Sequence, residues 1–387
     1  MKLLTVVAHE SHASRLRYDV VVLGGGIIGC ALGWELARRG QSVAVVERGA
    51  IGAEASKAAA GILSAQMDLA RPGPFFELCQ VSRRMYGGWV RELERASRAS
   101  VGYHVDGILY LARTKDEAER MGRRSRWQRK RGLRVERWSP HEVRRREPNV
   151  DGSIAAGFFF PTEAQVDNVA IMEALAVACR KAGVTVMDGT TAIRVLTRRR
   201  RVVGVQTSRG AYQAPVVVNC LGSWAPLMGV LPRPAVVPAR GQMLAFDAPK
   251  GLFRHVIMAE AAYGVQRRDG RLIVGSTVEL VGYDRRVTLE GMAKILSGFR
   301  ALVRGEILDR CTFVECWAGL RPCSQDRLPI LGATPIEGLL VAAGHFRHGI
   351  LLAPVTAALM AELILGRRPS CDLAPFSLSR FGKRFLD

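Results

Sequence analysis

Three glycines, spaced G-x-G-x-x-G between two apolar runs, are the residues of this chain whose types and spacing point most directly to chemistry. Gly24, Gly26 and Gly29 follow the β-branched run 20–23 and lead into a helix-like stretch at 30–39. In such a unit the first glycine permits a tight turn, and the second lets a pyrophosphate approach the backbone. The third glycine lets the helix pack closely on the strand. The spacing therefore indicates a phosphate-binding turn.

An acidic residue ends the next apolar run at the expected distance. Glu47 follows the run 42–46, about 20 residues after the glycines, where a carboxylate receives the two ribose hydroxyls. Ile27 and Ile28 open the helix, and their unpaired N–H groups would lie under the pyrophosphate. The alternative interpretation is a glycine-rich turn in some other α/β protein. Such a turn does not require a strand, a helix and an acidic residue at these spacings. The pattern predicts a dinucleotide-binding β-α-β unit.

The charge of the chain is strongly positive, formally +21 over 387 residues. Of its 56 basic residues eight are lysine, and the densest runs are 123–134, 144–146 and 198–201. These runs are expected to be solvated helix faces and a hairpin turn. A nucleic-acid groove would interleave basic residues with stacking aromatics, and only Trp127 and Trp138 meet that condition. We therefore expect no nucleic-acid partner, although the positive surface would steer anionic substrates.

The chain shows no sign of membrane insertion, secretion or a metal site. No apolar run reaches about 18 residues, and the apolar patch in residues 1–8 is too short for a signal peptide. Residues up to Arg17 are expected to form a loose extension. The eight cysteines form no C-x-x-C pair and no zinc-like spacing with histidine. Buried, reduced thiols in a cytoplasmic protein, without a metal, are the expectation.

The elements that must position these residues follow from periodicity. Helices are predicted at 75–99, in a charged stretch that ends at 131, and at 168–182, 292–302 and 354–365. Strands are predicted at 103–112, 158–166, 184–187, 192–196, 202–207, 216–221 and 338–343, whereas 50–67 reads as a loop and helix start. Alternating strands over 236–277 indicate a mainly antiparallel sheet. The fold class is therefore α/β, a Rossmann-like cofactor domain with a second α+β substrate domain.

The cofactor domain is expected to be discontinuous. Its predicted segments are 15–75, 145–230 and 310–387, and the substrate domain takes 76–144 and 231–309. Gly222, at the end of the buried run 216–221, marks a further place where backbone could approach the cofactor.

Several motifs resemble those of one enzyme family. They are the run Gly24 to Gly29, Glu47-Arg48-Gly49, Ser56, Ala58 to Leu63, Trp317 to Pro322 and Ala342 to Pro354. Together they resemble the D-amino-acid-oxidase-like flavoproteins, and within them the glycine oxidase branch, which feeds thiazole synthesis for thiamine. The resemblance runs from Tyr18 to about Leu365.

The resemblance implies FAD as the cofactor. The residues expected to bind it are Gly24, Gly26, Ile27, Ile28, Gly29, Glu47, Arg48, Ala55, Ser56, Ala60, Gly61, Ile62, Ala192, Gly222, His345, Phe346, Arg347, His348, Gly349, Ile350 and Leu351. Ala192 would meet the adenine. The turn 345–351 precedes a helix whose N–H groups would face the flavin pyrimidine edge, and their positive potential would stabilise the reduced flavin.

Three side chains are the expected catalytic and substrate-binding groups. Arg321 would bind the substrate carboxylate through two parallel hydrogen bonds. Tyr263 would be the second carboxylate donor, and Arg347 would lie near substrate and flavin. Each has a purely structural alternative. Arg321 could pair with an internal acidic residue, Tyr263 could be a core tyrosine with a surface hydroxyl, and Arg347 could form an ion pair that closes the turn. His345 and His348 would orient that turn, and neither is expected to be a general base.

Two further positions bear on substrate and cofactor. Ala261 stands two residues before Tyr263, where glycine oxidases often have a polar residue, so the choice among small substrates is left open. Cys323 lies two residues after Arg321, and some relatives that oxidise N-methyl amino acids bond a cysteine in this neighbourhood to the flavin. An incidental thiol is the alternative.

The resemblance implies oxidative deamination of glycine or of a small D-amino or N-methyl amino acid. Hydride would pass to flavin N5, the imine would give a 2-oxo acid and ammonia, and oxygen would yield hydrogen peroxide. A D-amino acid dehydrogenase that passes electrons to a quinone, a sarcosine-oxidase-like enzyme, a tRNA-modifying flavoprotein and a non-enzymatic FAD subunit are the alternatives. Expected partners are other copies of the chain, for example as a tetramer, and a thiazole synthase.

Overall fold

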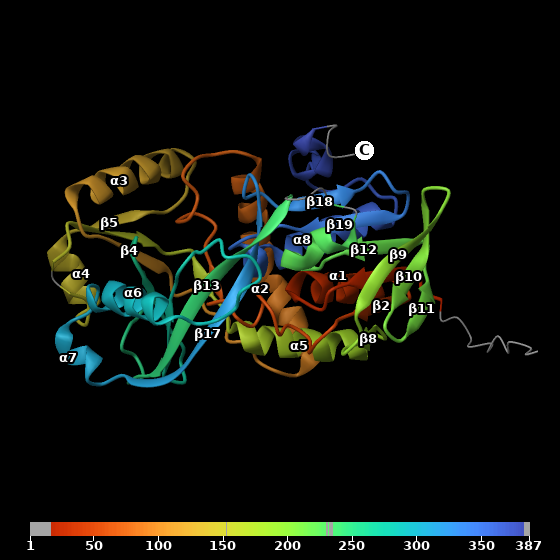
Figure 1. The fold of residues 1–387 in the computed structure, drawn as a ribbon. Helices are drawn as coiled ribbons and strands as arrows, with labels where there is room; N and C mark the ends of the chain where they lie inside the picture. The colour runs from red at the N-terminus through yellow and green to blue at the C-terminus, as the bar shows by residue number, and fades with distance from the viewer. Residues whose placement is uncertain (1–16, 152, 230, 232–234, 383–387) are drawn as a thin grey trace, which may run out of the picture.

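A computed structural model describes residues 17–151, 153–229, 231 and 235–382. The predicted extension up to Arg17 lies outside the described residues, apart from Arg17 itself. Two sheets organise the structure, one in each half of the molecule (Figure 1).

The first sheet has six strands and carries the glycine-rich turn. Its order is β18 (Ile330–Ala333), β19 (Leu339–Ala343), β12 (Val216–Asn219), β1 (Val20–Leu23), β2 (Val43–Val46) and β8 (Thr185–Met187). All neighbours are parallel except β18, which runs antiparallel to β19. β1 and β2 are buried along their whole length, as strands of a parallel sheet that is covered on both faces must be.

Alternate residues of β1 and β2 face two different layers. Val20, Val22, Val43 and Val45 pack with the helices α1 (Ile27–Arg38), α2 (Pro74–Ser97), α5 (Asn168–Lys181) and α8 (Gly349–Ile364). Val21, Leu23, Ala44 and Val46 pack against the small antiparallel sheet of β9 (Ala192–Arg198), β10 (Arg201–Thr207) and β11 (Gly210–Gln213). The arginine run 198–201 forms the β9–β10 turn, as predicted.

The second sheet has eight strands and forms the other half. Its order is β17 (Thr312–Ser324), β13 (Val236–Asp247), β16 (Arg271–Gly275), β15 (Tyr263–Gln266), β14 (Val256–Met258), β4 (Ile108–Ala112), β6 (Ala156–Phe160) and β5 (Glu136–Trp138). Only β14 and β4 pair in parallel. The helices α3 (Lys115–Lys130), α4 (Pro140–Arg146), α6 (Leu289–Arg300) and α7 (Gly305–Leu308) belong to this half (Figure 1). The predicted α/β class with a mainly antiparallel second sheet is confirmed.

Short elements complete the fold. β3 (Ile62–Leu63) pairs with β7 (Ala164–Gln165), and the 3₁₀ helix η1 (Gly222–Met228) follows β12. Two further 3₁₀ helices, η2 (Ala374–Phe376) and η3 (Leu378–Phe381), end the described chain. β3 lies in the segment that was predicted to be loop, and the strands β5, β11, β17 and β18 were not predicted.

The last helix begins earlier than predicted. α8 starts at Gly349. The prediction placed its start at Pro354, because proline is common at the first position of a helix. Burial of Ile350 to Ala353 against the cores of α1 and α2 extends the helix upstream of the proline. The turn 344–348 is correspondingly short, and the helix N-terminus lies directly behind it.

Three elements lie in a different half from the one that their segment was expected to join. β6 and β17 fall within predicted cofactor-domain segments but belong to the eight-stranded sheet. α2 falls within a predicted substrate-domain segment but packs with α5 and α8. Strand patterns do not show which sheet a strand joins, because pairing is decided between residues far apart in the chain. The domain boundaries themselves stay a prediction.

Among the described residues, no helix is both long and apolar enough to cross a membrane. All eight cysteines are free thiols, and four of them are buried.

Candidate functional site

A cavity of about 440 Å³ lies between the two sheets, over the glycine-rich turn. It is walled by the turn after β1, the segment 54–64, the start of η1, the β14–β15 connection, β17 and the start of α8. The predicted site residues that line it are Gly24, Gly26, Ile27, Ile28, Glu47, Arg48, Ala55, Ser56, Ala60, Gly61, Ile62, Ala192, Gly222, Tyr263, Arg321, His345, Phe346, Arg347, His348, Gly349 and Ile350. The fold thus gathers segments from both ends of the chain around one space.

Glycine is required at two positions of the turn by the chain's own packing. A Cβ on Gly24, whose φ is +103°, would lie 2.6 Å from the Cys220 carbonyl oxygen, and one on Gly29 would lie 1.9 Å from the Gly24 carbonyl oxygen. At Gly26 the nearest atom to such a Cβ is the Ser56 hydroxyl, at 3.3 Å, so a side chain there would fill the cavity instead. An open cradle at the start of α1 fits a bound pyrophosphate.

Glu47 is held in place by backbone N–H groups. Its two carboxylate oxygens accept hydrogen bonds from Gly25 N at 2.8 Å and Gly49 N at 2.9 Å. Because each carboxylate oxygen has a second acceptor site, both can also accept a ribose hydroxyl. Beside it, the Arg48 guanidinium lies 4.0 Å from the Trp224 ring centroid and 2.5 Å from Glu54.

The alanine-rich wall of the cavity is fixed from behind by donors of three side chains. Trp317 Nε1 donates to Ala58 O at 3.0 Å, Arg267 Nη2 donates to Ala60 O at 2.8 Å, and Asn168 Nδ2 donates to Lys57 O at 2.6 Å. The small side chains of the alanines leave the backbone of this wall close to the cavity, and a planar ring system could lie against it.

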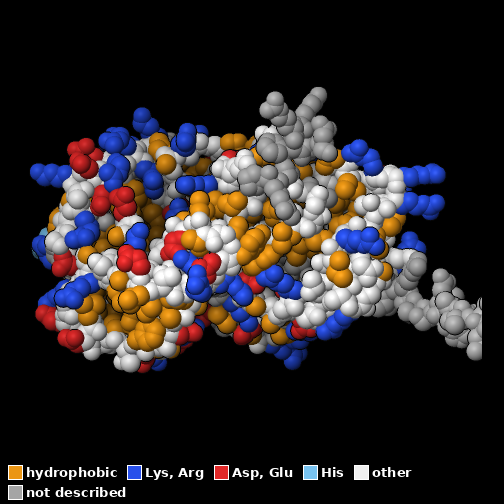
Figure 2. Space-filling model, in the orientation of Figure 1, with side chains coloured by type: hydrophobic (Ala, Val, Ile, Leu, Met, Phe, Trp, Pro, Cys, Tyr) orange, Lys and Arg blue, Asp and Glu red, His pale blue; other side chains and the backbone are white. Residues whose placement is uncertain are grey.

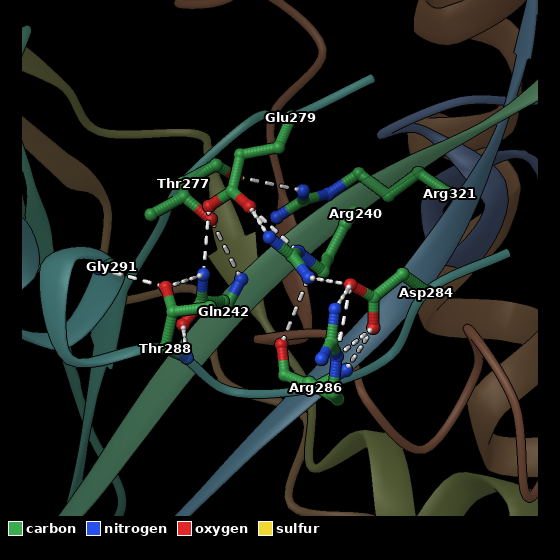
Figure 3. A network of polar contacts seen from close by, with 9 residues as sticks. All are labelled: Arg240, Gln242, Thr277, Glu279, Asp284, Arg286, Thr288, Gly291 and Arg321. Carbon is green, nitrogen blue, oxygen red and sulfur yellow. Dashed lines mark hydrogen bonds and ion pairs between the residues drawn. The ribbon is translucent and has the colours of Figure 1, made fainter. Parts of the chain in front are cut away.

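Arg321 extends from β17 into the cavity with its charge uncompensated. Nη1 donates to the Thr277 carbonyl at 3.0 Å (Figure 3), and Nη2 donates to the Ser276 hydroxyl at 2.9 Å. The side chain fits because it passes over Gly241 of β13, where a Cβ would lie 1.8 Å from Nη1. Among the described acidic residues, none forms an ion pair with Arg321, so the predicted alternative of an internal ion pair is not observed. Burial lowers the pKa of this guanidinium, and Tyr263 partly offsets the effect.

A polar network behind Arg321 holds the segment that receives it (Figure 3). Thr277 Oγ1 accepts from Gln242 N at 3.0 Å, and Gln242 Nε2 donates to Glu279 at 2.8 Å. The buried Arg240 forms ion pairs with both Glu279 and Asp284. The Thr277 carbonyl is therefore fixed relative to β13.

Tyr263 opens β15 beside Arg321. Its hydroxyl lies 3.2 Å from Met243 Sδ, and a Cβ on Gly275 would lie 2.5 Å from the same hydroxyl. Tyr263 lines the cavity, so its hydroxyl could donate to a bound carboxylate in place of the Met243 sulfur. Ala261, two residues earlier, also lines the cavity.

The turn before α8 carries two buried histidines. Nε2 of His345 lies 3.2 Å from Thr356 Oγ1, and burial lowers the pKa of His345 to about 3. Burial also lowers the pKa of His348, both of whose ring nitrogens are buried without a hydrogen-bond partner among the described residues. Its Nε2 lies 3.7 Å from Asp68 Oδ2. An unpartnered polar ring on the cavity wall fits a cofactor that brings its own hydrogen-bonding atoms.

Arg347 is exposed at the same turn. Its guanidinium lies 5.4 Å from the Phe346 ring centroid, and it forms no ion pair with a described acidic residue. The predicted alternative, an ion pair closing the turn, is therefore not observed.

Two predicted cofactor residues do not line the cavity. Gly29 lies beneath the turn, where it makes room for the Gly24 carbonyl, and Leu351 is buried in the core on the inner side of α8. Cys323 is also absent from the cavity wall, and its thiol lies 3.5 Å from the Ser324 carbonyl oxygen. A covalent bond from this cysteine to a flavin in the cavity therefore has no support in the geometry.

Sequence reasoning missed several cavity residues. They include Asp68, Trp224, Met258, Glu260 and Ser276. Trp224 had a signal, because an aromatic residue follows the predicted approach point Gly222. The others reach the cavity only through long-range packing.

Comparison with known proteins gives a consistent result over nearly the whole chain. The model of the family described as FAD dependent oxidoreductase (DAO) matches residues 19–363. A glycine oxidase of Geobacillus kaustophilus is 35% identical over 369 residues, which are 94% of this chain and 97% of that protein. The crystal structure of glycine oxidase from Geobacillus kaustophilus superimposes with a TM-score of 0.90 at 34% identity and covers 94% of this chain and 99% of that one.

A bifunctional protein named ThiO/ThiG, from Synechocystis sp., is 36% identical over 371 residues. The match covers 94% of this chain but 54% of that protein. This chain thus spans about half the length of the bifunctional relative.

Proposed function

The chain belongs to the family of FAD-dependent oxidoreductases, and from this premise we propose that it oxidises the amine of a small amino acid, with glycine as the first candidate. FAD is its cofactor. The relatives named glycine oxidase support this choice of substrate. The single observation that carries the proposal is the Arg321 guanidinium, which reaches the cavity without a carboxylate partner.

The cofactor would be held by the residues that line the cavity. Gly24 to Ile28 would bind the pyrophosphate, Glu47 the ribose, and the backbone near Ala192 the adenine. The alanine-rich wall and the turn 345–350 would lie beside the ring system. When bound, FAD accepts the hydride from the substrate α-carbon and is reoxidised by oxygen with release of hydrogen peroxide.

The substrate would be held by its carboxylate. Arg321 can form two parallel hydrogen bonds to it, and the Tyr263 hydroxyl can donate a third. Fixing the carboxylate at two points orients the α-carbon toward the cofactor, and this positioning lowers the barrier without further chemistry from side chains.

His345 is not suited to be a general base. It is tied to Thr356, and burial lowers its pKa to about 3, so it is too weakly basic to hold a proton near neutral pH. The ammonium proton of the substrate would instead be lost to solvent, since the positive charges of Arg321 and Arg347 favour the neutral amine. Arg321 thus binds the substrate and also favours its reactive form.

Anaerobic mixing of the FAD-loaded protein with glycine, sarcosine and D-alanine tests the proposal. Loss of flavin absorbance with glycine, followed by peroxide when air is admitted, is the expected result. Reduction by D-alanine with little peroxide would instead indicate a dehydrogenase that uses a quinone. A protein that binds FAD but is reduced by none of these compounds would contradict the proposed substrate class.

Partners and location form part of the same proposal. The bifunctional relative joins a region similar to this chain to a second region, which supports the transfer of the product imine to a thiazole-forming partner. Self-association as a tetramer and a cytoplasmic location complete the proposal. Size-exclusion chromatography with light scattering measures the first, and fractionation of cells measures the second.

A further inference from the structure

A second chamber, of about 310 Å³, adjoins the main cavity on the side of α3. The two spaces share part of their walls, namely Asp68, Met258, Ala259, Glu260 and Arg347. Glycine has no atoms that could extend into this chamber. A longer substrate anchored at Arg321 would have space for its distal end there.

Two guanidinium groups without a carboxylate partner face this chamber. Arg124, on α3, donates from Nη1 to the Met67 carbonyl oxygen, and Arg347 stacks beside Phe346. Neither forms an ion pair with an acidic residue in the part of the chain that the structure describes. Burial lowers the pKa of Arg124, and the charge of Arg347 lowers it further. Two like charges therefore meet at one space, which favours binding of an anion between them.

Two of the three acidic residues that line the chamber already accept a hydrogen bond from a donor outside the proposed anion site. Glu260 accepts a hydrogen bond from Arg120 at 2.8 Å, and Glu117 accepts one from Arg113 N at 2.6 Å. Asp68 offsets part of the charge of Arg124 but lies 3.7 Å from His348. The donors left over in the described lining of this chamber are those of the two arginines and the Tyr110 hydroxyl.

We propose that this chamber binds a second anionic group of the substrate, through Arg124 and Arg347, while Arg321 binds the α-carboxylate. The inference rests on the proposed amino acid oxidation and adds to its substrate class. Besides glycine, the site would accept α-amino acids or N-substituted glycines that carry a further carboxylate. Arg347 lies on the shared wall and influences the pKa of both Arg124 and Arg321, so it stands between the two carboxylate sites.

Calorimetric titration of the FAD-loaded protein with unreactive acids tests the chamber without turnover. Succinate, glutarate and adipate are compared with their monoamides, which keep the length and lose one charge. At least one dicarboxylate should bind about ten- to a hundredfold more tightly than its own monoamide, the range expected for a hydrogen bond to a charged group.

Arg124→Gln is the informative variant, because it keeps a donor for the Met67 carbonyl and removes the charge. It should reduce the preference for the dicarboxylate to about one. The matched control is Arg126→Gln, which removes an exposed charge from the same helix and should leave the preference unchanged. Equal binding of acid and amide by the unmodified protein overturns the inference, and so does a preference that survives Arg124→Gln.

Turnover then links the chamber to the reaction. The ratio of kcat/KM for D-glutamate over D-glutamine, and for N-(carboxymethyl)glycine over its monoamide, should exceed ten for at least one pair and fall in Arg124→Gln. Ratios near one for both pairs overturn the substrate class. If no amino acid at all is oxidised, the proposed function fails, whereas the titration still decides independently whether the chamber binds a second anion.

Discussion

At the scale of one residue, Arg321 forms a binding site because its hydrogen-bond partners in the protein are neutral and leave its positive charge unbalanced. Its two terminal nitrogens donate to the Thr277 carbonyl and the Ser276 hydroxyl, both of which are neutral. These contacts fix the guanidinium plane but do not balance its charge. A desolvated charge of this kind gains most from a carboxylate ligand that completes its hydrogen bonds.

Replacing Arg321 with methionine should therefore lower kcat/KM for the amino acid substrate by about 100-fold or more. Arg321→Lys should lie in between, because an ammonium keeps the charge but cannot form two parallel hydrogen bonds. Steady-state peroxide production measures both. Arg310→Met removes an exposed charge and is the matched control; unchanged kinetics in Arg321→Met would exclude the carboxylate role.

His345 makes the stability of the protein depend on pH. Burial lowers its pKa to about 3, whereas in the unfolded chain it is about 6.5. Below about pH 6.5 this histidine binds a proton in the unfolded chain but stays neutral in the folded chain. The free energy of unfolding therefore falls as the pH falls from about 6.5 toward 3.

His345→Gln should remove this dependence and keep a polar partner for Thr356. Below pH 6 the wild type should lose up to about 1.4 kcal/mol per pH unit more than the variant. Urea unfolding at a series of pH values gives the difference, in which other titrating groups cancel. His141→Gln, at an exposed position, should keep the wild-type slope. Parallel curves for His345→Gln and the wild type would refute the assignment.

At the scale of elements, the start of α8 needs support from α2. Pro354 lacks an N–H, so the carbonyl of Ile350, four residues earlier, loses its usual helical partner. The Tyr86 hydroxyl donates to that carbonyl at 3.3 Å, and the Ser82 hydroxyl donates to Leu351 O at 2.6 Å. These contacts explain how the helix can begin upstream of its proline, with its N-terminus at the cavity.

A double-mutant cycle tests this compensation. Tyr86→Phe should cost about 1 kcal/mol of unfolding free energy, and it should weaken FAD binding because α8 begins at the cavity wall. In the Pro354→Ala background the restored N–H can bond to Ile350 O, so the cost of Tyr86→Phe should be smaller. Tyr103→Phe removes a hydroxyl from the ring packed beside Tyr86 and serves as control. Equal costs in both backgrounds would rule out the compensation.

The same helix shows what could be predicted from the sequence and what could not. The glycine turn, Glu47 and Arg321 were predicted, because local spacing or a quoted motif marks each of them, and Tyr263 was predicted from the family resemblance. The predicted start of α8 was wrong. Tyr86, whose hydroxyl replaces the N–H donor that Pro354 lacks, lies far away in the chain, so no local pattern shows that the helix extends upstream of the proline. Asp68 and Ser276 were missed for the same reason, since only the tertiary fold brings them to the cavity.

At the scale of the whole molecule, the positive charge is dispersed. On the face in Figure 2, Lys and Arg side chains are spread over both halves of the molecule and do not form a single stripe. This arrangement gives a nucleic acid no continuous track on that face. It suits a general attraction of small anions toward the protein.

The two halves of the molecule are joined over the cavity by residues 276–288, which we term the clasp loop. The Tyr283 hydroxyl donates to Ser223 O at 3.0 Å, and the Tyr283 ring lies 5.6 Å from that of Trp224. Arg285 pairs with Glu54, which lines the cavity, at 3.2 Å. On its own side the loop is fixed by Arg240 (Figure 3). The clasp loop thus connects the eight-stranded half to the cofactor half.

Removing the cross-half ion pair should let the cofactor leave more easily. Arg285→Ala should weaken FAD binding about two- to fivefold, since an exposed ion pair contributes up to about 1 kcal/mol. The effect should shrink at high salt, which screens exposed charges. FAD release, followed by flavin fluorescence at low and high salt, measures both. The adjacent Arg286 is a matched control, because it pairs with Asp284 within the loop itself, and Arg286→Ala should leave FAD release unchanged. If both variants release FAD at the same rate, loop stability in general is responsible, and the contact between the halves is not what retains the cofactor.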